Sequence, residues 1–180
     1  MAPSIATLNL GFLTILHEPN GYVGGYLVTN GWGRPLEFRL STAVQPNRVQ
    51  QILYGGTLQS YICADLIGKT LVDKTTSAAQ LIVTDHEPVL DLRLCLQVPV
   101  VWLARPDDPL AAAMLSDATC VRSASRGRGP LLCHPRFRDD APAVRRLLDH
   151  LDPSFDLAEP FGRIREAIGE ARKMGVTGRN

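Results

Sequence analysis

The stretch Leu81-Ile82-Val83-Thr84-Asp85-His86-Glu87-Pro88 is a short apolar run that ends abruptly in an acid, an imidazole and a second acid. An apolar run of this length, bounded by turn residues, is typical of a strand that is buried on both faces. In open α/β folds, sites form where such strands deliver polar groups at their carboxyl ends. Asp85, His86 and Glu87 are therefore the first candidates for a functional site.

Three segments that favour β-structure precede this strand. Residues 12–16 and 21–29 are rich in β-branched and aromatic side chains, and residues 36–40 alternate apolar and charged side chains as a half-buried strand does. Between the last two, residues 30–35 supply the glycines of a hairpin turn. The chain is expected to begin with three antiparallel strands.

The period of the apolar residues then changes to that of helices. Residues 47–74 carry apolar positions at a spacing of about three and a half, with a break at Gly55-Gly56. After the strand at residue 81, a short helical segment and a further buried strand at 98–103 follow. The order predicts an α/β fold that leans toward α+β, with a mixed sheet opened by three antiparallel strands and continued as helix, strand, helix, strand.

The character of the sequence shifts after residue 104. Residues 1–104 are expected to form the α/β core, and residues 105–180 a helical C-terminal extension packed on it. Asp107-Asp108-Pro109 is a good helix start, and two apolar stripes predict helices near the C-terminus. Between them, residues 120–138 are rich in Arg, Gly and Ser and predict a loop.

Composition sets further bounds. The chain has 180 residues, of which 45% are hydrophobic and 21% charged, as in an ordinary globular protein, and its formal net charge is +1. Strong binding to a nucleic acid backbone usually requires a basic excess, so any anion site must be local. No secretory signal or membrane-spanning run is apparent, and the four cysteines show no close pair. We expect a bacterial-type soluble domain in the cytoplasm, with no membrane association.

The order of elements resembles the ribonuclease H-like fold, and residues 81–103 are similar in outline to endonuclease V-like proteins, in which an apolar strand ends in an Asp and a Val-Pro strand follows. This resemblance implies a nuclease in which carboxylates hold Mg²⁺ or Mn²⁺. Asp85, Glu87 and Asp65 would be the ligands, and His86 would move a proton. The resemblance also requires an acid within the first strand. Residues 12–16 contain none, and Glu18 is the nearest.

Because that acid is missing, the sequence favours a non-catalytic binding protein or subunit of a complex, without a cofactor, and leaves enzyme activity uncertain. The alternative is a divalent-metal-dependent nuclease or phosphodiesterase with catalytic Asp85, Glu87, Asp65 and His86. A second alternative is a small-ligand-binding domain that uses the same strand-end crevice.

Other residues suggest binding. Five arginines in a stretch without acids are candidates for contact with nucleic acid or an acidic protein: Arg122, Arg126, Arg128, Arg136 and Arg138. Trp32, expected at a hairpin tip, is a candidate contact for a protein partner. Cys120, Cys133 and His134, with His150 as a fourth ligand, are a possible zinc site, although no short paired spacing supports it.

Overall fold

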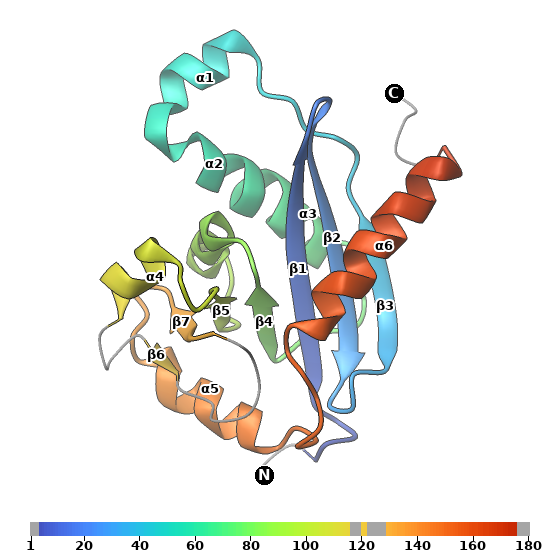
Figure 1. Ribbon diagram of the computed structural model, residues 1–180, viewed down its shortest axis with the longest axis vertical. Coiled ribbons are helices and arrows are strands. Elements are labelled where there is room, and N and C mark those ends of the chain that lie inside the picture. Colours follow the sequence, from blue (N-terminus) through green and yellow to red (C-terminus); the bar gives the residue numbers. More distant parts are fainter. Residues whose placement is uncertain (1–3, 116–119, 122–128, 176–180) are drawn as a thin grey trace.

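A mixed sheet forms the centre of the protein in the computed structural model, which describes residues 4–115, 120–121 and 129–175 (Figure 1). Within these residues the sheet has seven strands in the order β3-β2-β1-β4-β5-β7-β6. The strands are β1 (Asn9–Glu18), β2 (Gly21–Asn30), β3 (Pro35–Leu40), β4 (Leu81–Thr84), β5 (Val100–Leu103), β6 (Cys120–Val121) and β7 (Leu131–Cys133).

The strand directions confirm the predicted mixed α/β sheet. β1, β2 and β3 are antiparallel neighbours, as expected from their alternation and the hairpin turn between β2 and β3. β4 then lies parallel to β1, and β5 parallel to β4. Parallel neighbours require crossover segments, which the helices between these strands supply. The carboxyl ends of β4 and β5 consequently lie at the same edge of the sheet.

Helical segments of several kinds connect the strands. Asn47 caps the first of them by accepting a hydrogen bond from the backbone N–H of Gln50, in a reciprocal capping box. The segments are the α-helices α1 (Arg48–Tyr54), α2 (Leu58–Ser60), α3 (Lys69–Asp73), α4 (Pro109–Met114), α5 (Asp140–Asp149) and α6 (Glu159–Lys173), the 3₁₀ helices η1 (Gly55–Thr57) and η3 (Glu87–Leu94), and the π-helix η2 (Tyr61–Gly68). None of the helices in the described residues is long and apolar enough to cross a membrane.

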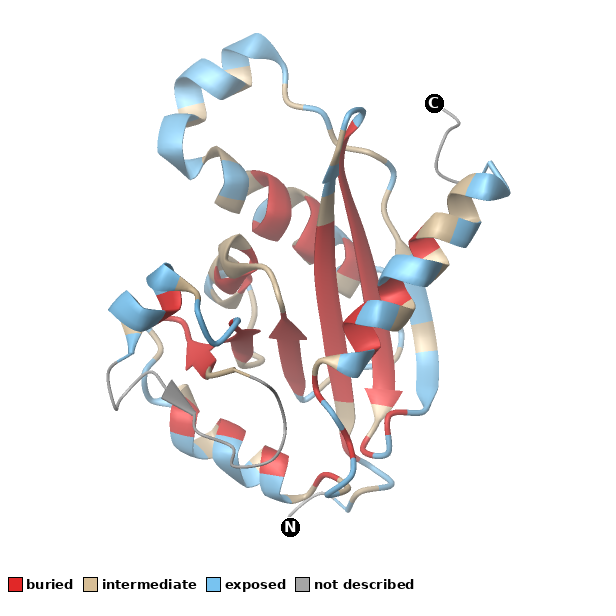
Figure 2. Ribbon diagram, in the orientation of Figure 1, coloured by how far each residue is buried: buried red, intermediate tan, exposed pale blue. Residues whose placement is uncertain are grey.

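The two faces of the sheet bury separate apolar clusters. One face, which includes Phe12 and Val83, packs against α5 and α6. The other face, which includes Leu13 and Ile82, packs against η2, η3 and α4. Neighbouring residues of one strand contribute to opposite clusters, because successive side chains of a strand point to opposite faces. The buried strands at the centre and the exposed outer surfaces of the helices are visible in Figure 2.

Helix α1 buries no residue, and the same holds for the short segments η1 and α2 that follow it. Helix α1 projects from the sheet, and its whole length is exposed or half-exposed (Figure 2). The apolar patch that the spacing predicts, Val49, Ile52 and Leu53, is 62%, 65% and 77% exposed. Helical periodicity identifies the helix, but it does not show whether another element covers its apolar face.

The sequence predicts a helical extension over residues 105–180. In the structure this part of the chain also supplies strands β6 and β7 to the sheet. Strand β7 pairs with β5 in antiparallel register, so one sheet runs through both parts of the chain. Leu131 and Cys133 join one apolar cluster and Leu132 the other. These three residues are too short a run to stand out beside the Arg, Gly and Ser residues that precede them.

Candidate functional site

Asp85 lies directly after the buried strand β4, at the carboxyl edge of the sheet. The hydroxyl of Thr84, the last residue of the strand, accepts a hydrogen bond from the backbone N–H of His86 at 3.1 Å. This local bond turns the chain out of the strand and into η3. The turn leaves Asp85, His86 and Glu87 at the carboxyl edge of the sheet, as the sequence predicts.

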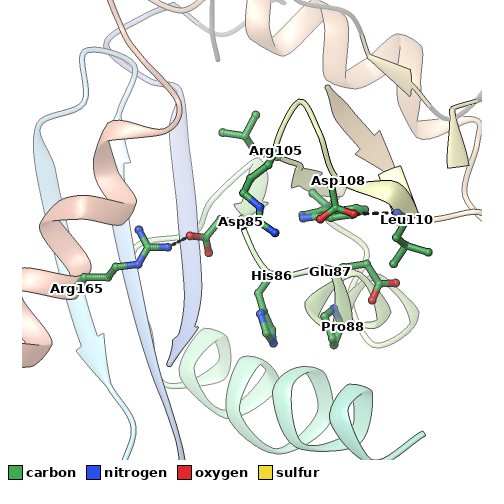
Figure 3. A pocket seen from close by; sticks show the side chains of 10 residues that line it. Asp85, His86, Glu87, Pro88, Arg105, Asp108, Leu110 and Arg165 are labelled. Carbon is green, nitrogen blue, oxygen red and sulfur yellow. Dashed lines mark hydrogen bonds and ion pairs between the residues drawn. The ribbon is translucent and has the colours of Figure 1, made fainter. Parts of the chain in front are cut away.

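A pocket of about 470 Å³ opens at this edge, beyond the ends of β4 and β5 (Figure 3). A volume of this size is within the range of small-molecule sites. It combines acids, an imidazole, two guanidinium groups and apolar side chains. Its lining residues are Asp85, His86, Glu87, Pro88, Trp102, Leu103, Arg105, Asp108, Leu110 and Arg165.

The carboxylate of Asp85 is paired with a residue from the far end of the chain. Arg165 of α6 donates a hydrogen bond from its Nη2 to Oδ2 of Asp85. The Asp85 side chain is only 18% exposed, whereas that of Arg165 is 48% exposed. The second oxygen of Asp85 is buried and has no hydrogen-bond partner among the described residues. One carboxylate oxygen of Asp85 is therefore hydrogen-bonded, and the other is buried without a partner among the described residues.

The environment of the pocket shifts the pKa values of two neighbouring groups. Burial lowers the pKa of His86, assisted by nearby His17 and opposed by the charge of Asp85. Burial raises the pKa of Glu87, and the nearby acids Asp91 and Asp108 raise it further. Nε2 of His86 is buried and has no hydrogen-bond partner within the described part of the chain. Near neutral pH, His86 is thus held in its uncharged form, which can accept a proton.

The acids that the sequence suggested as metal ligands do not all meet here. Asp85 and Glu87 both line the pocket, but their carboxylates point in different directions, Asp85 toward Arg165 and Glu87 away from it (Figure 3). Asp65 is exposed on η2, where it accepts a hydrogen bond from Cys95 Sγ at 3.6 Å. Glu18, at the end of β1, is paired with Arg172. Among the described residues, no three His, Cys, Asp or Glu side chains are grouped to hold a metal ion.

The strand register shows what stands in place of the missing first-strand acid. Leu13 of β1 pairs with Thr84 of β4. Beyond this pair, the next residue of β1 is Thr14 and the residue that follows β4 is Asp85. Thr14 is buried, and its hydroxyl carries no charge to share a metal ion with Asp85. The donors present therefore do not fit the carboxylate-bound metal centre that the resemblance implies.

The possible zinc ligands have other partners. His134 lies 3.1 Å from Asp91 through Nε2, and its Nδ1 accepts a hydrogen bond from the backbone N–H of Arg136 at 3.1 Å. Nδ1 of His150 lies 2.6 Å from the carbonyl oxygen of Arg146. Cys133 is buried in β7, and the side chain of Cys120 is outside the described residues. Both ring nitrogens of His134 are thus occupied by protein groups.

The candidate binding residues are divided between described and undescribed parts of the chain. Arg122, Arg126 and Arg128 lie outside the described residues. Arg136 and Arg138 are exposed, and Arg138 donates a hydrogen bond to the carbonyl of Pro135 at 3.3 Å. Trp32 is 53% exposed in the turn after β2. Its contact with a protein partner stays a prediction.

Sequence reasoning missed the two arginines of the pocket. Arg105 follows β5 and is exposed, and Arg165 comes from a helix that is eighty residues from Asp85 in sequence. The position of Arg105 just after a buried strand was a usable signal, since it repeats the logic that identifies Asp85. No local pattern marks Arg165, because its spacing on α6 is that of any solvent-facing residue.

Comparison with known proteins supports the architecture. No protein-family model matches the sequence, and no curated protein matches it. Solved structures do match. Endonuclease V from Streptomyces avermitilis aligns with a TM-score of 0.55 and 14% identity over 95% of this chain and 86% of its own. Endonuclease V from Bacillus subtilis aligns with a TM-score of 0.51 and 11% identity over 91% of this chain and 83% of its own.

These likenesses correct the preference for a non-catalytic binding protein. Both solved structures named above are of endonuclease V and align over most of their length, which supports the nuclease alternative better than the binding-protein hypothesis. The preference for a binding protein was based on the absence of an acid in the first strand. That absence argues against one kind of metal site, but it does not argue against the fold. The resemblance proposed from residues 81–103 is confirmed: the chain has the ribonuclease H-like fold seen in endonuclease V structures.

Proposed function

We propose that this chain is a phosphodiesterase that acts on a nucleic acid, and that the pocket at the carboxyl ends of β4 and β5 is its active site. The observation that carries the proposal is that, in an endonuclease V-like fold, an acid at the end of a central strand and two guanidinium groups line one pocket. Guanidinium groups match the geometry of phosphate oxygens. With a net charge of only +1, this local pair supplies the attraction that the whole chain lacks.

Four polar groups of the pocket have roles that their environment favours. Arg105 and Arg165 face a bound phosphate. His86, uncharged near neutral pH because burial lowers its pKa, accepts a proton from an attacking hydroxyl or water. The attacking oxygen bonds to phosphorus, the bond from phosphorus to one nucleotide oxygen breaks, and that oxygen takes the proton from His86. Asp85 loses its arginine partner when phosphate takes that partner, and its carboxylate then orients the attacking group.

Mg²⁺ or Mn²⁺ would be the cofactor of a nuclease of the expected kind, but Asp85, Glu87 and Asp65 do not fit such a site. The roles proposed for Arg105, Arg165, His86 and Asp85 therefore do not involve a metal ion. Whether an added metal ion changes the reaction is a question for the assay, which includes Mn²⁺, Mg²⁺ and a chelator as separate conditions.

The test is cleavage of end-labelled single-stranded and double-stranded DNA and RNA by the purified chain. Asp85→Asn removes the acid while keeping its shape, and Asp149→Asn, at an exposed position on α5, is the matched control. We expect the wild type and the control to cleave at least one substrate, and Asp85→Asn to be slower by about 100-fold or more, as for other positioned acid–base groups. Equal cleavage by Asp85→Asn, or no cleavage of any substrate under any of the conditions, would overturn the proposal.

A further inference from the structure

The pocket at the strand ends has a smaller neighbour of about 180 Å³. The two share part of their walls, so that each opens on a common set of side chains between them. The shared residues are Asp85, Leu103, Arg105 and Arg165. The Asp85–Arg165 ion pair thus stands at the boundary between two adjoining hollows.

The two hollows differ in chemistry. On the larger side, His86, Glu87 and Asp108 provide polar groups. On the smaller side, the wall consists mainly of apolar residues, among them Pro106, Ala158 and the buried ring of Phe161. A volume of about 180 Å³ is below the usual range for a whole ligand and suits one apolar-faced part of a larger one, such as a base or a sugar.

Arg165 has further N–H donors at this boundary besides the one that bonds to Asp85. A guanidinium carries five N–H groups, and the hydrogen bond that Arg165 makes to the described residues uses one of them, toward Asp85. Its side chain is 48% exposed, so a ligand can reach part of it from solvent. Arg105 is also exposed, and it lines both hollows together with Arg165. An anion at the boundary would therefore meet two guanidinium groups without any rearrangement of the sheet.

We propose that Arg165 binds the backbone phosphate of a single-stranded nucleic acid whose two adjacent nucleotides occupy the two hollows, one in each. The inference rests on the proposed function and names its substrate class. A nucleotide can enter a recessed hollow only when its base is not stacked within a duplex, which favours a single strand. The larger, polar hollow takes one nucleotide, and the smaller, apolar hollow takes the base or sugar of the next.

Because Asp85 and Arg165 form an ion pair, substituting the one or the other should change the affinity for nucleic acid in opposite directions. In the free protein, Asp85 competes with phosphate for the guanidinium of Arg165. Asp85→Asn removes this competition and a negative charge, and should therefore tighten binding while it slows the cleavage proposed above. Arg165→Gln should weaken binding. Arg172→Gln is a matched control, because Arg172 also lies on α6 and also pairs with a carboxylate, that of Glu18 on β1, but lines neither hollow.

The experiment measures the binding of a fluorescently labelled single-stranded hexanucleotide by anisotropy over a series of salt concentrations. We expect Arg165→Gln to weaken binding by about 10-fold to 100-fold, the equivalent of one charge-assisted hydrogen-bonded contact. The slope of log K against log salt should fall by about 0.7, the value for one phosphate of a single strand. Arg172→Gln should leave both quantities unchanged, and Asp85→Asn should bind more tightly than the wild type.

Two sets of variants keep the result interpretable. Measuring Arg165→Gln and Arg172→Gln also in the Asp85→Asn background slows cleavage of the probe. It also removes the charge of Asp85, which Arg165→Gln alone would leave without its partner. A dinucleoside monophosphate should compete with the probe, and an equimolar pair of nucleosides should not. Unchanged affinity and slope in Arg165→Gln, or preference for a duplex over a single strand, would overturn the inference. If the wild type cleaves nucleic acid but Arg165→Gln binds the probe as tightly as the wild type, only the proposed function stands. If Arg165→Gln weakens binding but the wild type cleaves no substrate, only the inference about Arg165 stands.

Discussion

The guanidinium of Arg165 on α6 contacts the carboxylate of Asp85 at the end of β4, joining the C-terminal helix to the centre of the sheet across eighty residues of sequence. The pair is unequal, because the acid is only 18% exposed and the arginine 48%. Removing the arginine leaves a mostly buried charge without a partner. Removing the charge of the acid leaves an arginine that water can solvate.

This asymmetry predicts unequal losses of stability. Arg165→Gln should lower the free energy of unfolding by about 1–3 kcal/mol, the cost of an unsatisfied buried polar group. Asp85→Asn should lower it by less than about 1 kcal/mol, as for a partly exposed ion pair. Urea unfolding followed by tryptophan fluorescence measures both. The double variant should lose less stability than the sum of the two single losses, because the two side chains are in contact. Additive losses would contradict this contact, and equal losses in the two single variants would contradict the unequal burial.

Much of the fold is predictable from the sequence because its signals are local. The alternating residues 36–40 and the apolar run before Asp85 identify strands β3 and β4 where the structure has them. The ends of the strands are less well marked: β1 runs from Asn9 to Glu18, well beyond the predicted residues 12–16. Strand propensity indicates where a strand is centred, and pairing with β2 over ten residues extends it.

The candidate site is only half predictable. Asp85, His86 and Glu87 are placed by the end of one strand, which the sequence shows. Asp65 is one residue from the apolar face of its helix, a spacing that indicates a direction around the helix axis but not which end of the sheet the residue approaches. Arg165 depends on how α6 crosses the sheet, and no period in the sequence records that crossing. Long-range packing decided both outcomes.

Gly24 and Gly25 permit helices to approach β2 closely on both faces. A Cβ atom on Gly24 would lie 2.2 Å from Cγ2 of Ile67 in η2, and one on Gly25 would lie 2.4 Å from Cγ2 of Ile164 in α6. Neither distance is sterically possible without a shift. Each Gly→Ala substitution should therefore cost about 1–3 kcal/mol by overpacking, measured by urea unfolding. Gly56→Ala, which meets nothing within 4 Å, is the control and should be neutral or slightly stabilising. Similar effects at all three positions would exclude overpacking as the cause.

Glu37 on β3 anchors the loop that leads into β4. Its carboxylate accepts hydrogen bonds from the backbone N–H of Ser77 at 2.9 Å and of Thr76 at 3.0 Å, and it pairs with Arg39. The Ser77 backbone bond, followed by bonds from Thr76 and Arg39, lowers the pKa of Glu37 from its ordinary 4.5 to about 2.

A pKa lowered by folding makes the stability conferred by Glu37 dependent on pH. The stability is present above pH 4.5, where the carboxylate is charged in both states, and is lost as the pH falls toward about 2. Glu37→Gln should therefore be less stable than the wild type near pH 7, and the difference should narrow in acid. Thermal unfolding across this range tests the expectation. Glu170→Gln, at an exposed position on α6, is the control. A difference that stays constant from neutral pH to acid would contradict it.

Arg93 and Asp140 join elements from opposite faces of the sheet, η3 and α5. Arg93 Nε and Nη2 donate to the Asp140 carboxylate at 2.7 and 3.3 Å, and Nη1 donates to the carbonyl of Leu96 at 2.6 Å. Its guanidinium also lies 3.9 Å from the ring centroid of Phe137. The two charged side chains are only 11% and 15% exposed.

Breaking one side of this pair should be costly. Asp140→Asn leaves the buried guanidinium without its counter-charge and should lower the free energy of unfolding by about 3 kcal/mol. Arg93→Lys keeps the charge but loses the forked bond and the contact over Phe137, so it should also destabilise, to a smaller extent. Lys173→Gln breaks an exposed pair with Glu170 and should change stability by less than about 0.5 kcal/mol. If Asp140→Asn were no more harmful than Lys173→Gln in the same urea titration, the pair would not hold η3 and α5 together.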